Sequence, residues 1–437
     1  LFSSAKPDFD SGFVSVAAGD YDRRNIEGAL SLSQSDTLAW RFSGFMEQRD
    51  GYVSDVNAGS DYLDDRDRWG TRVQALYTPE PDLSVRVIAD WSELEEACCA
   101  AGSWKNNLRS DAAAPGEPPR VGTDARVLAN GGVVVPDSDF YDYRTALSTP
   151  SRSRNEDGGL SLHISWQWER LQLTSITAAR HFELDDFGDA DFGDLAVVDG
   201  GVAVEDTQYS QEFRASGSGS RLQWRAGLEW DKLESRADSR LLLGDDIADF
   251  TGTPPEALPA GSGAFSDVRQ DTDSVALFGQ SDIAVTDTVT FTTGMRWTHE
   301  EKKLRNVFTE DASPSLDFTT PGWGFWLLDP LTPRENLHEN IDDDQLTGTL
   351  KLAWSPGDHS LLYASWGTGY KSGGVNIDRL EPTIDPVFDA ETSETIEIGA
   401  KLSWPSRGVR LALAAHHTEI DDLQVRSLEG TSFTVRN

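Results

Sequence analysis

The chain has 437 residues, 38% of them hydrophobic, and a formal net charge of −36. This charge would repel the phosphates of nucleic acid and excludes nucleic acid as a partner. No run of about 18 apolar residues occurs, which excludes transmembrane helices. The first residues also lack the charged and apolar regions of a signal peptide, so we expect either a protein that is not exported or a mature or truncated piece.

Alternation of polar and apolar residues begins at residues 37–49, where the apolar set is Leu38, Trp40, Phe42 and Met46. The same pattern recurs at residues 69–77, 83–91, 160–168, 221–232, 289–297, 346–354 and 396–404. A period of two indicates a strand with one apolar face and one wet face. The segments run about ten to thirteen residues, longer than the five or six of an ordinary strand and close to the length of a tilted membrane-spanning strand.

Short and long connections alternate along the chain. The short ones fall at residues 33–37, 79–82, 169–170, 217–220, 286–287, 355–358 and 405–408, and the long ones at 95–155, 184–204, 234–270, 303–341 and 373–391. Turns at one end and loops at the other are typical of outer-membrane barrels. The pattern predicts an all-β fold, a transmembrane antiparallel up-and-down β-barrel of about sixteen strands. We expect the last two strands at Val409–Ile420 and near Gln424–Val435.

Aromatic residues indicate which medium meets the apolar face. They lie near both ends of the predicted strands, at Tyr77, Trp168, Trp354 and Trp404 beside short turns and at Trp91, Trp230 and Trp297 at the far ends. Two aromatic rows flanking a lipid-facing band are expected of a membrane barrel. The alternative, the core of a soluble protein, would place these residues toward strand middles.

No catalytic or metal-binding constellation is found, so we expect neither an enzyme nor a cofactor. His416 and His417 point to opposite faces of one strand. The acidic stretch 183–194 does not match a calcium loop and is interpreted as a solvated outer loop. The adjacent Cys98 and Cys99 could form a vicinal disulfide or be an ordinary loop pair.

Charged residues project from the wet face by the same parity. The candidate lumen-lining residues for ligand binding are Arg72, Arg86, Arg225, Glu229 and Arg296, and the same parity places Arg41, Arg214, Lys351, Lys401, Arg410, Glu47, Asp90, Glu212 and Glu397 beside them. Such a lining could steer an anionic ligand. The alternative is that these charges bond one another and a domain inside the barrel.

Several segments together resemble TonB-dependent outer-membrane receptors. The matching segments are residues 35–55, 65–93, 206–217, 275–303, 361–376 ("LLYASWGTGYKSGGVN") and 391–404 ("ETSETIEIGAKLSW"). The resemblance implies a barrel of about twenty-two strands, an N-terminal plug and a segment that contacts TonB. We therefore expect residues 1–437 to be a partial barrel domain without its plug and its C-terminal strands.

The resemblance also implies a function. It implies a Gram-negative outer-membrane protein, surrounded by lipid and lipopolysaccharide, that takes up a scarce small-molecule or metal-chelate ligand with energy from TonB. A ferric siderophore or similar iron complex is the commonest implied substrate. Two alternatives stay open: a passive porin of about sixteen strands, and a soluble carbohydrate-binding or hydrolytic β-protein.

Overall fold

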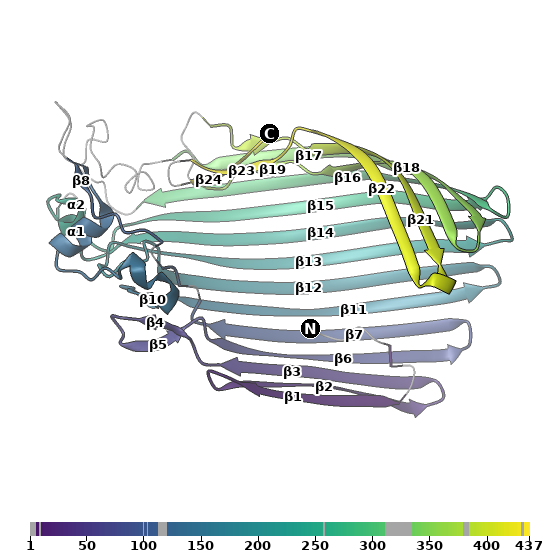
Figure 1. Ribbon diagram of the computed structural model, residues 1–437, viewed down its shortest axis with the longest axis horizontal. Coiled ribbons are helices and arrows are strands. Elements are labelled where there is room, and N and C mark those ends of the chain that lie inside the picture. Colours follow the sequence, from purple (N-terminus) through teal and green to yellow (C-terminus); the bar gives the residue numbers. More distant parts are fainter. Residues whose placement is uncertain are drawn as a thin grey trace.

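The computed structural model in Figure 1 describes residues 6–7, 10–98, 100–102, 104–111, 120–256, 258–310, 334–378, 384–429 and 432–437. One sheet of 15 strands dominates it, and each strand pairs with its neighbour in the chain order of that sheet. Its strands are β1 (Ser11–Gly19), β2 (Arg23–Ser35), β3 (Leu38–Arg49), β6 (Arg66–Glu80), β7 (Leu83–Glu96), β11 (Arg152–Trp168), β12 (Leu171–Asp189), β13 (Val198–Ser218), β14 (Leu222–Leu243), β15 (Gly263–Ala284), β16 (Val289–Glu310), β17 (Leu337–Gly357), β18 (Ser360–Lys371), β21 (Glu391–Trp404) and β22 (Val409–Asp421). All of the pairings are antiparallel, which confirms the predicted up-and-down topology.

One predicted strand is placed wrongly. Residues near Gln424–Val435 do not join the large sheet but form a hairpin, β23 (Val425–Glu429) and β24 (Ser432–Arg436), whose strands pair with each other. Within the described residues β1 and β22 are the two edges of the large sheet.

The middle strands are longer than the alternation predicts. β14, β15 and β16 each have 22 residues. A strand needs about nine to eleven residues to cross a membrane, so these strands extend well beyond that length. The predicted loop 184–204 begins with the end of β12, the loop 234–270 with the end of β14 and the loop 303–341 with the end of β16, so each connection begins later than expected.

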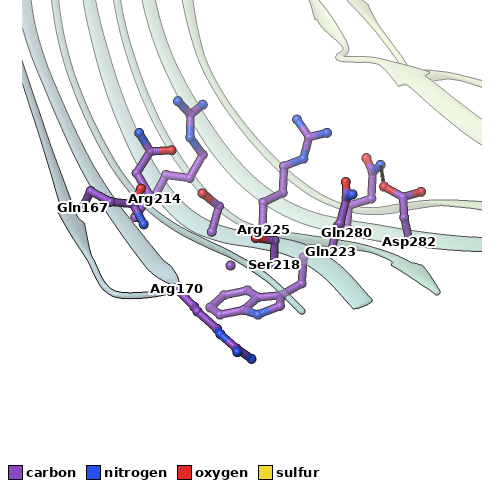
Figure 2. Close-up of a pocket in the computed structure, with 12 residues that line it drawn as sticks. Gln167, Arg170, Arg214, Ser218, Gln223, Arg225, Gln280 and Asp282 are labelled. Atoms are coloured by element: carbon purple, nitrogen blue, oxygen red, sulfur yellow. Dashed lines mark hydrogen bonds between the residues drawn. The ribbon is translucent and has the colours of Figure 1, made fainter. Parts of the chain in front are cut away.

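The pairing register separates two faces. Phe213, Leu228, Leu277, Trp297 and Leu346 lie directly opposite one another on five successive strands and expose 54%, 46%, 59%, 42% and 62% of their surface. The next row, shifted by one residue, is Glu212, Glu229, Ala276, Thr298 and Gln345. Because a shift of one residue exchanges the faces, the two rows lie on opposite sides of the sheet. The polar row shares the face of Arg225, which lies on the concave side in Figure 2.

Aromatic rings cover glycines on neighbouring strands. A Cβ atom added to Gly227 would lie 2.4 Å from Cζ of Phe278, and one added to Gly158 would lie 2.3 Å from Cε3 of Trp91. Both glycines are directly paired with the residue that carries the ring. The rings can lie flat on the sheet only because these positions have no side chain.

Small elements gather at the end opposite the short turns (Figure 1). They are β4 (Val53–Asp55), β5 (Ser60–Leu63), β8 (Ser110–Asp111), β9 (Arg120–Val121), β10 (Arg144–Thr145), α1 (Thr123–Ala129), η1 (Asp137–Asp142) and α2 (Ile247–Thr251). Two further short strands, β19 (Gly374–Val375) and β20 (Val387–Phe388), lie between β18 and β21, and η3 (Pro405–Arg407) forms one of the short turns. None of the helices in the described part of the chain is long and apolar enough to cross a membrane.

Buried apolar clusters make this end a folded cap. One cluster joins α2 to the ends of β13, β14 and β15 through Val198, Leu243, Ile247, Phe250 and Ala264. The other joins β4 and β5 to the loop before β11 through Val53, Leu63 and Leu147. The described segments that contribute to these two clusters are therefore packed against each other and against the strand ends.

Candidate functional site

Three of the predicted lumen residues lie together on the concave face of β14–β16. Nη1 of Arg296 is 2.8 Å from Oε2 of Glu229, and its Nε donates to Oγ1 of Thr298 at 3.1 Å. Arg225 lies on β14 four residues before Glu229 and so shares its face. Among the described residues, the Arg225 guanidinium has no ion pair or hydrogen bond, which leaves its charge available to a ligand.

The other two predicted residues lie in a separate group. Arg72 pairs with Asp90 at 3.4 Å, and Asp90 also accepts from Arg180 at 3.2 Å. Arg86 donates through Nε to Oε1 of the fully buried Gln74 at 3.1 Å. Because β11, β12 and β13 separate β7 from β14 in the sheet, the five predicted residues form two groups and not one site.

A polar cavity of about 480 Å³ adjoins the short-turn end of the β14 group. Figure 2 shows Arg214, Arg225, Gln280 and Asp282 on the concave side of the sheet, whereas Arg170, in the turn after β11, points away. Gln280 contacts Asp282 at 3.5 Å, and Asp282 accepts from Oγ1 of Thr292 at 2.5 Å. The two arginines give the cavity donors suited to a polar or anionic group, and the Asp282 carboxylate, held by Thr292, adds an acceptor.

A second cavity, of about 390 Å³, continues along the same wall. It shares Arg214, Arg225 and Gln280 with the first cavity and extends to Arg296 and Thr349. The two cavities therefore form a continuous cationic lining, which we call the arginine wall: Arg214, Arg225, Gln280 and Arg296.

Gln280 and Asp282 were missed among the sequence candidates. The alternation of residues 275–284 places both on the wet face of their strand, so a signal was present. Gln280 lies directly opposite Arg225 on the neighbouring strand. Alternation could not predict this pair, because it depends on the register between the two strands.

The acidic stretch 183–194 is not simply a solvated loop, as the sequence suggested. Its first residues belong to β12, and Asp189 is buried, accepting from the backbone N–H groups of Ser148, Asp191 and Phe192. The Asp191 carboxylate accepts from the N–H of Val198 at 2.8 Å. Burial of that carboxylate, with the negative Asp189 beside it, raises the pKa of Asp191 to about 7.

A second buried carboxylate lies in the small sheet of the cap. Asp55 is 2% exposed and accepts from Oη of Tyr62 at 3.1 Å and from the N–H of Asn57 at 3.0 Å. Burial and this carboxylate raise the pKa of Tyr62 to about 12. In the neighbouring loop Cys98 is disulfide-bonded, while Cys99 lies outside the described residues.

Comparison with known proteins identifies the architecture. A family model described as the TonB-dependent receptor-like β-barrel matches residues 101–437. Among solved structures, the ferric yersiniabactin uptake receptor FyuA from Yersinia pestis matches with a TM-score of 0.71 and 16% identity over 96% of this chain and 56% of that one.

Two further structures give the same picture. The siderophore receptor PiuA from Acinetobacter baumannii has a TM-score of 0.63 at 12% identity, covering 97% of this chain and 59% of PiuA. The copper transporter OprC has a TM-score of 0.63 at 13% identity, covering 98% and 58%. The chain thus spans less than two thirds of each of these proteins, and at such identities the likeness concerns the fold.

Proposed function

The chain belongs to the TonB-dependent receptor β-barrel family, and from this premise we propose that the whole protein is an outer-membrane receptor of a Gram-negative bacterium. It takes up a scarce solute with energy delivered through TonB. Lipid and lipopolysaccharide surround its convex face, where exposed residues such as Leu228 and Leu277 supply the apolar band.

The proposed ligand is a ferric siderophore or a similar iron complex. Support comes from the kind of protein that shares the fold, including a ferric yersiniabactin receptor and a siderophore receptor. The observation that carries the proposal is the unpaired Arg225 between two polar cavities. In a chain of net charge −36, an inward cation of this kind attracts an anionic ligand locally.

The same charges also suit a second occupant of the lumen. A plug domain would bring its own carboxylates and carbonyls to the arginine wall, and the paired Arg72 and Arg86 favour this structural role for the β6–β7 group. We therefore assign ligand contact to Arg225 and Arg296, and structural contact to Arg72 and Arg86.

The test is uptake by the full-length protein. A strain lacking the gene is complemented with the natural sequence, with Arg225→Gln, or with Arg407→Gln as the matched control, which removes an exposed arginine of a short turn that lines neither cavity. Cells are starved of iron and supplied with ⁵⁵Fe bound to a panel of anionic and neutral siderophores.

We expect TonB-dependent uptake of at least one anionic complex. Loss of one charged hydrogen bond, about 1.5–3 kcal/mol, should weaken its binding roughly tenfold or more in Arg225→Gln. Arg407→Gln should behave as the natural protein. Uptake that persists in a strain without TonB would refute the proposal and favour a passive pore instead.

The family match disfavours the porin alternative, because the family model that matches residues 101–437 describes receptor barrels.

A further inference from the structure

The inward-facing residues change character near the cap. On β13–β15 the positions that share the face of Arg225 become mainly apolar, at Val202, Ala237, Leu241, Ala264 and Val268, with the small Ser239 and Ser266 among them. Val268 and Ala264 are 7% and 3% exposed. The concave face is therefore charged near the short turns and mainly apolar near the cap.

The segment after β18 covers part of this apolar wall. Nζ of Lys302 on β16 donates to Oγ of Ser372 at 2.5 Å and to the carbonyl of Gly373 at 2.7 Å. Nδ2 of Asn306 donates to the carbonyl of Ile377 at 2.8 Å, while its Oδ1 accepts from Ser266 at 2.7 Å. Asn306 is fully buried as a result.

The β23–β24 hairpin holds the covering segment, residues 372–378, on its other side. Asn376 exchanges two hydrogen bonds with the backbone of Val435 in β24, at 2.6 and 2.9 Å, and its own N–H donates to the carbonyl of Pro386 at 2.7 Å. Residues 372–378 are therefore fixed against both β16 and the β23–β24 hairpin.

A cavity of about 400 Å³ remains between this segment and the wall. Its side-chain lining includes Val202, Ala237, Leu241, Ala264, Val268 and Ile377. Arg240 also borders it, but the Arg240 guanidinium lies 4.5 Å from the ring of Phe187, which occupies the opposite face of the sheet. The Asp378 carboxylate at its edge already accepts from the N–H of Phe433 at 2.7 Å.

We propose that this cavity, the apolar mouth pocket, binds an uncharged apolar group of the incoming ligand, either a ring system or a branched hydrocarbon. The inference rests on the proposed function and adds a site to it. An apolar cavity of roughly 150 Å³ already takes up benzene, so the mouth pocket has room for a larger group. Removal of that group's surface from water drives binding.

The mouth pocket and the arginine wall act in succession. Ala237 and Arg225 lie twelve residues apart on β14, which at about 3.3 Å per residue separates them by roughly 40 Å. A compact ligand cannot span that distance. The apolar group is therefore held first, near the cap, and the polar or anionic part meets Arg225 afterwards.

The test measures the pocket directly in the full-length protein in lipid nanodiscs. Ala237→Cys is compared with Gln223→Cys, which lies on the same face of the same strand but in the polar cavity. Each variant reacts with benzyl methanethiosulfonate and with its trimethylammonium-ethyl counterpart. In both reactions the thiolate attacks the reagent sulfur, forms a mixed disulfide and releases methanesulfinate. The natural protein gives the background.

We expect the ratio of benzyl to cationic labelling rates to be roughly tenfold higher at position 237 than at position 223. Adding Ile377→Asp, which places a carboxylate in the lining, should remove that difference. Equal ratios at both positions, or no reaction of either reagent at position 237, would overturn the proposal. The labelling assay contains no transport substrate. If the uptake experiment fails but the tenfold difference in labelling is preserved, only the proposed function is refuted.

Discussion

The guanidinium of Arg296 on β16 reaches across β15 to the carboxylate of Glu229 on β14, 2.8 Å away. Ala276 of β15 lies directly opposite both Glu229 and Thr298 and is 1% exposed. Its short side chain leaves the room that this contact between non-adjacent strands needs. The pair therefore depends on a small residue between its partners.

This ion pair should contribute little to stability. Both side chains are more than a third exposed, at 39% and 38%, so water and salt screen the attraction. A double-mutant cycle of Arg296→Gln and Glu229→Gln, measured by urea unfolding of the full-length protein, should give a coupling of about 0–1 kcal/mol. A coupling of several kcal/mol would contradict the exposed geometry.

The lipid face can be tested at Leu350, midway between Leu346 and Trp354 on the outward side of β17. Leu350→Arg places a cation near the middle of the lipid band and should cost about 2–4 kcal/mol of unfolding free energy. The neighbouring Thr349 faces the lumen and lines a polar cavity. Thr349→Arg should cost less than about 1 kcal/mol, and equal costs would mean that the faces are assigned wrongly.

Glycine is required where a ring crosses the strand. Gly227→Ala brings a Cβ to 2.4 Å from the Phe278 ring and 2.8 Å from the carbonyl of Phe213. Overpacking of this kind costs about 1–3 kcal/mol. Gly279→Ala is the matched control on the adjacent strand, because its nearest neighbour would be 3.6 Å away. A drop in melting temperature is expected for the first variant and not for the second.

The connection between β12 and β13 should loosen as the pH rises. The pKa of Asp191 is raised to about 7 in the fold, above its unfolded value near 3.8, so the folded state binds the proton more tightly. That contribution to stability is complete below the unfolded value and is lost as the pH rises through about 7. The protection factors of residues 190–198, which are hydrogen-exchange rates corrected for the intrinsic effect of pH, should therefore be lower at pH 8 than at pH 5. Asp191→Asn should abolish most of the difference.

The small sheet of the cap depends on a buried carboxylate. Tyr62→Phe removes one of the donors to Asp55 and should cost about 1 kcal/mol locally, whereas Asp55→Ala leaves several donors unsatisfied and should cost more. Protease cleavage within residues 53–63 reports the difference. A greater effect of Tyr62→Phe than of Asp55→Ala would exclude Asp55 as the organising residue.

Faces could be predicted from the sequence because alternation is local. Arg225 and Leu228 differ in parity within one strand, and no knowledge of other strands is needed to place them on opposite sides. The up-and-down order of the strands could be predicted as well, because each strand of the large sheet pairs with the next strand of that sheet along the chain. Register could not be predicted, so nothing showed that Arg296 meets Glu229.

The cap was the part that sequence patterns described least well. Above the aromatic row, β14 continues through Glu234, Arg236 and Asp238, whose outward side chains are charged. The inward positions of this stretch, Ser235, Ala237 and Ser239, are small. No large apolar residue therefore marks a period of two, and these residues read as a loop. The segment that forms β23 and β24 was predicted to be one strand of the large sheet because its alternation is intact. In the structure its two halves pair with each other instead.

The order of strands in the large sheet has a consequence for how the wall is made. Each strand of that sheet lies beside the strand that precedes it within the sheet, so one connection of the chain joins each pair of neighbours. Closing a shorter loop costs less entropy, so these pairings cost less than pairings that skip a strand. The wall can therefore grow by one hairpin at a time, with each finished strand serving as the template for the next.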